Sequence, residues 1–70
     1  MTDVDVTGRV RAALEDAEEP LSTGAIQRRV AREGLDVATS AIRAACEELL
    51  EAGEIAAVGE EPREQYRAVD

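Results

Sequence analysis

The sequence predicts an α+β domain in which three helices are followed by a two-stranded antiparallel hairpin. Three observations lead to this prediction. Apolar residues recur at helical spacing in three successive segments, a proline or a glycine follows each segment, and short β-compatible runs replace the helical spacing after Gly53. A chain of 70 residues has room for one core only, so we expect a single domain over residues 1–70.

The first helix is expected over about residues 5 to 18. Its apolar residues share one face of an amphipathic helix: Val6, Val10, Ala13, Leu14 and Ala17. Three polar residues near its start are candidate N-caps: Asp3, Asp5 and Thr7. Pro20 cannot continue the helix, because it lacks a backbone N–H and its ring clashes with the preceding turn.

The second helix opens within "PLSTGAIQRRVAREGL". Ser22 is the expected N-cap, and Leu21 is placed to pack on Ile26 as a hydrophobic staple. Leu21 itself is expected in a short extended segment. Ile26 and Val30 line the inner face, and Gly34 supplies the left-handed residue that commonly ends a helix.

The third helix is expected within "ATSAIRAACEELLEAGEI", residues 38 to 55. Its apolar stripe consists of Ile42, Ala45, Cys46, Leu49 and Leu50. Gly53 ends the helix. Three residues compete as its N-cap: Asp36, Ala38 and Thr39.

The runs "EIAAVG" and "EQYRAV", separated by the turn "EEPR", predict the hairpin. Ile55 with Ala57, and Tyr66 with Ala68, are expected on one face. The ring of Tyr66 is expected to close the core, with its hydroxyl at the surface.

The segments "PLSTGAIQRRV", "TSAIRAACEELLEAGEI" and "REQYRAV" resemble the second helix, the recognition helix and the wing of winged helix-turn-helix regulators of MarR and ArsR type. The resemblance covers essentially the whole chain, so we expect no separate effector domain. Cys46 departs from the pattern, since many family members have leucine there. On the apolar stripe, its thiol is expected to be buried and inert.

The resemblance implies double-stranded DNA as the partner, with the first half of the third helix in the major groove. It places these residues toward base edges: Thr39, Ser40, Arg43, Ala44 and Glu47. Arg28 and Arg32 are expected as the exposed pair that meets phosphates, while Arg29 lies near the core and buries its methylenes. Arg63 in the wing is expected to reach a flanking groove or the backbone. The sequence leaves open that the arginines of the second helix form only a solvated face.

The charge balance is unusual, because the net charge is −8 and all eight basic residues are arginine. Acidic, lysine-free surfaces are typical of proteins from salt-loving archaea. At 1 M salt the screening length falls to about 3 Å, so carboxylate repulsion costs little there. The alternative is an acidic protein from a GC-rich mesophile.

Enzymatic chemistry has little support in the sequence, which holds one cysteine, no histidine and no glycine-rich phosphate loop. We therefore expect neither catalysis, nor a cofactor, nor a metal site. No apolar run reaches the roughly 20 residues of a membrane helix, and the start "MTDVDV" does not resemble a signal peptide. A soluble, cytoplasmic protein is expected.

Two functions remain at this stage. The first is a DNA-binding transcription regulator or accessory factor that acts as a dimer. The second is a winged-helix module that binds a protein partner and does not contact DNA, which the acidic residues Glu47, Glu48 and Glu51 of the third helix favour. The position of the arginines in space discriminates between them.

Overall fold

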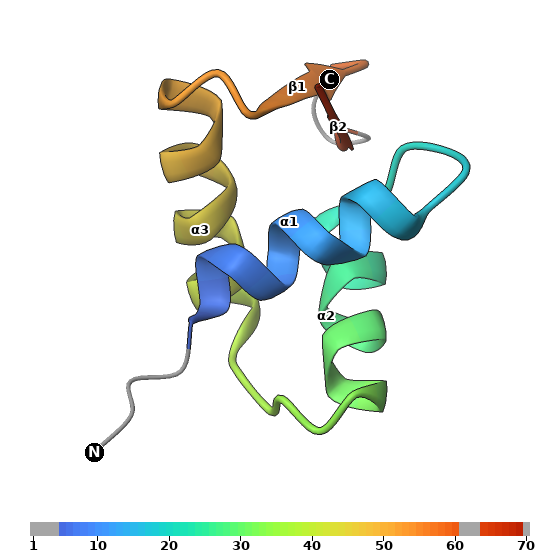
Figure 1. Ribbon diagram of the computed structural model, residues 1–70, viewed down its shortest axis with the longest axis vertical. Coiled ribbons are helices and arrows are strands. Elements are labelled where there is room, and N and C mark those ends of the chain that lie inside the picture. The colour runs from blue at the N-terminus through green and yellow to red at the C-terminus, as the bar shows by residue number, and fades with distance from the viewer. Residues whose placement is uncertain (1–4, 61–63, 70) are drawn as a thin grey trace.

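The computed structural model describes residues 5–60 and 64–69. Its elements are α1 (Val6–Asp16), α2 (Thr23–Arg32), α3 (Thr39–Glu51), β1 (Ile55–Val58) and β2 (Gln65–Ala68) (Figure 1). The two strands form an antiparallel sheet. The predicted α+β layout is confirmed, and the order of elements matches that of a winged helix. Asp3 and Arg63 lie outside the described residues.

Helix α1 begins after Asp5, whose Oδ1 accepts a 2.8 Å hydrogen bond from the backbone N–H of Gly8. The helix ends at Asp16, two residues before the expected end, and Ala17 has extended backbone geometry. Pro20 disfavours helical geometry at the residue before it. Carboxylates in a last helical turn also oppose the helix dipole, which explains why Glu18 is not helical.

Helix α2 is capped by Ser22, whose Oγ accepts a 3.2 Å hydrogen bond from the N–H of Ala25. Leu21 is extended, as expected, and forms an antiparallel bridge with Tyr66. The N–H of Leu21 donates to the carbonyl of Tyr66 at 2.9 Å, and the N–H of Tyr66 donates back at 2.8 Å. Strand β2 therefore lies between Leu21 and β1. Gly34 follows the helix with a φ of +100°, where a side chain would be strained.

Helix α3 starts after Ala38 and is followed by Gly53. In the hairpin, Ile55 lies opposite Ala68 and Ala57 lies opposite Tyr66, so the predicted shared face is confirmed. Ala57 is nevertheless exposed on that face, while Ile55 is buried.

The core combines all three helices with both strands. Its buried residues are Val10, Ala13, Leu14, Ile26, Val30, Leu35, Ile42, Ala45, Cys46, Leu49, Ile55 and Tyr66. Leu35, in the turn before α3, is a core residue that the helical periodicity did not reveal. The apolar face of α1 is buried by its own chain, so Val10, Ala13 and Leu14 offer no surface to a second copy. No helix in the described part of the chain is long and apolar enough to span a membrane.

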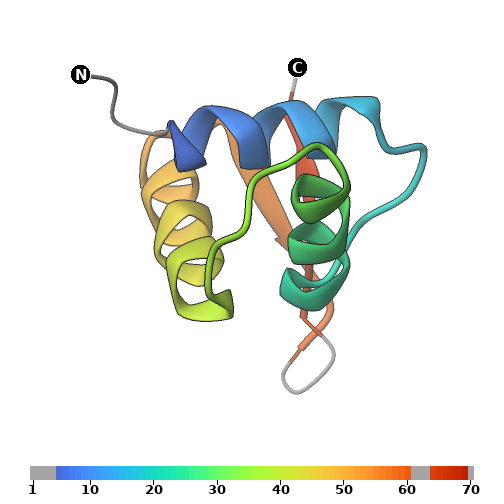
Figure 2. The same cartoon turned by 90° about the horizontal axis from the view of Figure 1, so that it is seen from below.

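Helix α1 lies across one side of the molecule, and the N-terminal ends of α2 and α3 lie on the opposite side (Figure 2). The loop-side ends of β1 and β2 are found on that same opposite side. We call this side the α3 face. It consists of the starts of α2 and α3 together with the loop-side ends of the hairpin.

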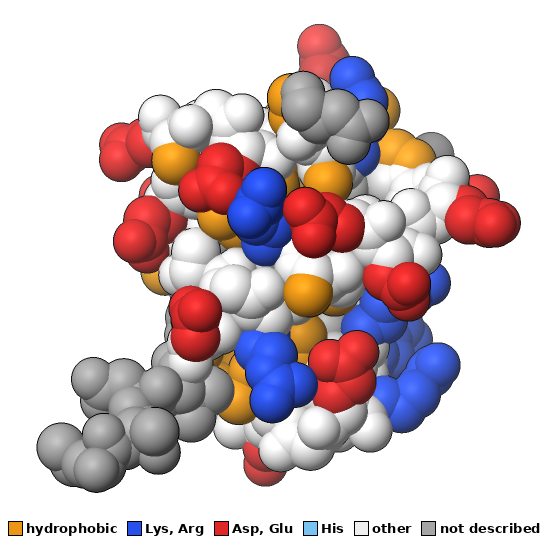
Figure 3. Space-filling view, viewed as in Figure 1, with side chains coloured by type: hydrophobic (Ala, Val, Ile, Leu, Met, Phe, Trp, Pro, Cys, Tyr) orange, Lys and Arg blue, Asp and Glu red, His pale blue; other side chains and the backbone are white. Residues whose placement is uncertain are grey.

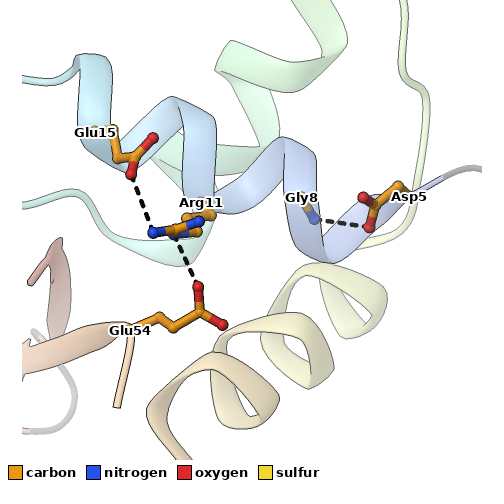
Figure 4. A network of polar contacts seen from close by, with 5 residues as sticks. All are labelled: Asp5, Gly8, Arg11, Glu15 and Glu54. Atoms are coloured by element: carbon orange, nitrogen blue, oxygen red, sulfur yellow. Dashed lines mark hydrogen bonds and ion pairs between the residues drawn. The ribbon is translucent and has the colours of Figure 1, made fainter. Parts of the chain in front are cut away.

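Four ion pairs are found among the described residues, and every one involves α1. Arg11 Nε lies 3.0 Å from Glu54 Oε1 and its Nη2 lies 3.5 Å from Glu15 Oε2 (Figure 4). Arg9 pairs with Glu33 at 3.4 Å, and Arg29 of α2 pairs with Asp16 at 3.9 Å. Two of the ion pairs therefore link α1 to the segments that follow α2 and α3, one links it to α2 itself, and one lies within α1.

Candidate nucleic-acid interface

The first half of α3 is accessible on the α3 face. Thr39, Ser40, Arg43 and Ala44 are all exposed, because the apolar stripe of the helix turns Ile42 and Ala45 inward instead. Four of the residues that the sequence assigned to base contacts therefore lie together on one helical surface. Glu47, one turn after Arg43, is exposed as well.

Thr39 is not entirely free on this surface. Its Oγ1 donates a 2.9 Å hydrogen bond to Oε1 of Gln27 in α2, and Gln27 Nε2 donates a 2.9 Å bond to the carbonyl of Val37. The hydroxyl of Thr39 thus fixes the start of α3 against α2, and only its acceptor capacity remains for a ligand. The sequence did not reveal this role of Gln27.

The start of α3 differs from the starts of the other two helices. Asp5 caps α1 and Ser22 caps α2 with side-chain hydrogen bonds, whereas Ala38 at the start of α3 forms none. The first turn of α3 holds no acidic residue, as in α1 and α2. Backbone N–H groups at such a helix end carry partial positive charge and are suited to a phosphate.

Arg43 borders a hollow of about 670 Å³ between the start of α2, the middle of α3 and the wing. The hollow is lined by Ser22, Thr23, Arg43, Glu47, Leu50, Glu64 and Tyr66. Arg43 has no ion-pair partner within 4.0 Å among the described residues. One arginine and two carboxylates thus share this hollow, so its charge is mixed.

Tyr66 lines the hollow on the side that faces the core. The residue is 4% exposed, and its hydroxyl donates a 2.8 Å hydrogen bond to Glu64 Oε1. Burial, followed by the hydrogen bond to the Glu64 carboxylate and its charge, raises the pKa of Tyr66 to about 12. The nearby Arg43 acts in the opposite direction. Tyr66 therefore stays protonated at neutral pH and closes the core, as the sequence predicted.

The arginines of α2 lie in the second half of the helix, and blue side chains gather over α2 in Figure 3. Arg28 and Arg32 are exposed and have no ion-pair partner among the described residues, whereas Arg29 is half-buried, as expected. At 1.5 Å per residue, Arg28 lies about 8 Å along the helix axis from Thr23. Arg32 lies about 14 Å from Thr23, at the end of α2 that is close to α1. Arg28 is therefore nearer the α3 face, and Arg32 is not brought to it.

Cys46 is fully buried among the apolar side chains of the core. Burial, and to a smaller extent the charges of Glu47 and Glu64, raises the pKa of its thiol to about 11. Such a thiol is uncharged at neutral pH and is out of reach of solutes, which agrees with the inert role expected for it. In the described ranges, no three His, Cys, Asp or Glu side chains are grouped to hold a metal ion.

Compared with known proteins, the sequence matches no protein-family model and no curated protein. The resemblance to MarR and ArsR regulators therefore rests on its own residues and on the winged-helix order of the elements.

Proposed function

We propose that this protein binds double-stranded DNA through the α3 face and acts as a transcription regulator or an accessory factor. The observation that carries the proposal is Arg43 on the first half of α3, which is exposed and has no ion-pair partner among the described residues. The start of α3 lies on the same side of the molecule as the start of α2 and the loop-side ends of the hairpin (Figure 2). Arg9 and Arg11 of α1, by contrast, form ion pairs with carboxylates. A helix end flanked by a wing is the geometry with which a winged helix enters a major groove.

In the proposed complex, Arg43 reads guanine through O6 and N7 and supplies most of the sequence discrimination. Ser40 hydrogen-bonds to a neighbouring base, and Ala44 contacts a thymine methyl group. The uncapped start of α3 and the side chain of Arg28 meet phosphates. Thr39 acts mainly through Gln27, by holding α3 at the required angle.

The net charge of −8 makes the phosphate contribution to affinity small. We attribute the acidic, lysine-free composition to a salt-rich setting, in which that contribution is weak for any protein and shape and base contacts dominate. A second copy bound to an adjacent half-site would double the few contacts of one chain. We therefore propose a dimer on DNA.

Fluorescence anisotropy with mixed duplex fragments across a KCl series tests the proposal. Binding is expected at low salt and weakens as KCl rises. Arg43→Ala and Arg28→Ala are expected to weaken it further, and loss of the phosphate contact of Arg28 lowers the slope of log affinity against log salt by about 1. Arg32→Ala, one helical turn beyond Arg28, and Arg9→Ala on the α1 side are the matched controls and leave affinity unchanged.

Circular dichroism at each KCl concentration must show that the domain is folded, because an acidic chain loses stability when salt is removed. Absence of binding in all conditions where the fold is intact would overturn the proposal. Equal losses in the Arg43 and Arg9 variants would also overturn it, since they would indicate only a general effect of charge.

A protein-interaction module is the second candidate, and one observation favours it. Glu47 and Glu64 share the hollow with Arg43, so the α3 face also presents two carboxylates that repel phosphates at low salt. If the protein is such a module, neither the wild-type protein nor Glu47→Gln binds duplex DNA. If DNA is the partner, the same substitution strengthens binding at low salt.

A further inference from the structure

Strand β1 forms an open edge of the sheet. The order across the sheet is β1, β2 and then Leu21, which bridges to Tyr66 on the far side of β2. Within the described ranges, β1 thus has a strand on one side only. An unpaired strand edge is a template on which another extended chain can pair.

The register shows which backbone groups of β1 point outward. Tyr66 directs both its N–H and its carbonyl to Leu21, so Ala57, which lies opposite Tyr66, receives no hydrogen bond from it. The carbonyl of Glu54 accepts a 3.0 Å bond from Val69, which places Glu54 among the inward-bonding positions. Bonding positions alternate along an antiparallel strand. The N–H and carbonyl groups of Ile55 and Ala57 are therefore directed away from β2.

Among residues 5–60 and 64–69, nothing gives this edge the usual protection. Edge strands are commonly blunted by charged side chains, by proline or by a covering segment. The segment from Ile55 to Gly59 is uncharged and free of proline, although 34% of the chain is charged. Ala57 and Gly59 are exposed. An approaching chain therefore meets accessible backbone and small side chains at the loop-side end of β1.

The charges at the two ends of the segment are negative. Glu54 precedes it with a partly exposed carboxylate, and because Glu54 shares the single cation of Arg11 with Glu15, this cluster keeps one net negative charge. Glu60 follows the segment and is exposed. Arg67 is on the neighbouring strand, but its side chain borders a separate hollow with Glu15 and Glu18 on the other side of β2. A complementary strand is thus uncharged in its centre and basic at its ends.

A second copy of the chain does not meet these requirements. In antiparallel self-pairing centred on Ala57, Glu54 of each copy would lie opposite Glu60 of the other. Like charges directly opposite each other destabilise a strand pair, and each copy carries a net charge of −8.

We propose that the β1 edge binds an extended segment of a basic protein partner by strand addition, with basic residues of the partner at Glu54 and Glu60. Main-chain hydrogen bonds to Ala57 provide affinity, and the two carboxylates set the register. The proposed edge does not include Arg43, but its loop-side end belongs to the α3 face. The peptide assay therefore tests it in the absence of DNA.

The probe is a fluorescein-labelled heptapeptide with arginine at both ends and alternating threonine and valine between them, so that its charges match the spacing of Glu54 and Glu60. Two matched peptides serve as controls, one with glutamate at both ends and one with N-methyl groups on the alternate residues that would donate to β1. Anisotropy is expected to rise with the full-length protein for the arginine peptide alone.

Two variants and one matched control test the site on the protein. Ala57→Pro removes an outward N–H without removing a bond to β2, and proline is tolerated at such edge positions. It is expected to weaken peptide binding about tenfold, whereas Ala57→Ser, which keeps the N–H, leaves binding unchanged. Glu60→Gln is expected to weaken binding about two- to fivefold at low salt and not at 1 M KCl.

Three outcomes would overturn the proposal. One is the absence of binding of the arginine peptide to the folded protein. Another is binding of the N-methylated peptide as tight as that of the arginine peptide. This result would overturn the proposal even if Ala57→Pro fails to fold. The last is self-association of the protein in sedimentation experiments, together with no binding of the arginine peptide. If Ala57→Ser retains this self-association and Ala57→Pro abolishes it, the edge belongs to a second copy.

Discussion

Thr39 and Gln27 are joined by a 2.9 Å hydrogen bond that connects the first turn of α3 to the middle of α2. Gln27 also donates to the carbonyl of Val37, so one amide fixes both sides of the turn. Gln27→Ala is expected to lower the free energy of unfolding by about 1–2 kcal/mol, because it leaves a partly buried carbonyl without a donor. Urea denaturation followed by circular dichroism measures the loss.

The control for this prediction is Thr39→Val, which removes the hydroxyl but leaves the bond between Gln27 and Val37. Its cost is expected to be about 0.5–1 kcal/mol. The double variant should cost no more than Gln27→Ala alone, since both changes remove the same bond between the helices. Additive losses would show that the two side chains act separately.

Asp5 and Gly8 are coupled at the start of α1 (Figure 4). A Cβ atom on Gly8 would lie 2.8 Å from the Asp5 carboxyl carbon, so alanine there displaces the cap. Gly8→Ala is expected to change stability little, because its helix-propensity gain of about 0.5–1 kcal/mol offsets the lost cap. In an Asp5→Ala background the same substitution should stabilise the protein by that full amount. An equal effect in both backgrounds, measured by thermal unfolding, would disprove the coupling.

Arg11 is the most connected ion-pair residue among those described, since it contacts both Glu15 and Glu54. Arg11→Met keeps most of the aliphatic stem and removes the charge. It is expected to cost up to about 1 kcal/mol at 50 mM KCl, and less at 1 M KCl where the remaining carboxylates are screened. Arg32→Met, at an exposed position without an ion pair in the described chain, is the control and should show no such loss.

Alkaline pH is expected to destabilise the domain through Cys46 and Tyr66. The folded protein holds their pKa values at about 11 and about 12, above their ordinary values of 9.0 and 10.0. Both groups are protonated in either state well below pH 9, so their contribution to stability is fully present there. As pH rises from 9 to 12, the unfolded chain loses these protons first and stability falls. For the fully buried Cys46 the loss is about 2–3 kcal/mol.

Cys46→Ala isolates the thiol contribution. In this variant the decrease in unfolding free energy between pH 9 and pH 11 should become smaller, while the decrease at higher pH due to Tyr66 remains. At pH 8 the wild-type thiol should react with a disulfide reagent only after denaturant is added. Rapid labelling of the folded protein would contradict the burial of Cys46.

Much of the fold could be predicted because it depends on local signals. The apolar stripes identified all three helices, and Ser22, Gly34 and Gly53 mark helix boundaries by their conformational preferences. The end of α1 was placed too late, because the periodicity continues through Ala17 while the acidic residues after it and Pro20 oppose helix.

The parts of the candidate site that could not be predicted depend on contacts between distant segments. The bond between Thr39 and Gln27 joins positions 12 residues apart through a flexible side chain. The hollow beside Arg43 depends on the angle between α3 and the wing, and periodicity carries no information on that angle. The exposure of Ala57 depends on where the helices stop covering the sheet.

The bridge between Leu21 and Tyr66 has a mechanical consequence. Tyr66 is held by Leu21 on one side and belongs to the β1–β2 ladder on the other. Any force that moves the hairpin is therefore transmitted to the residue just before the cap of α2. Hydrogen exchange at the Leu21 and Tyr66 amides should report this linkage directly, because both protons exchange only when the wing separates from the helices. We therefore expect the hairpin and the start of α2 to open as one cooperative unit.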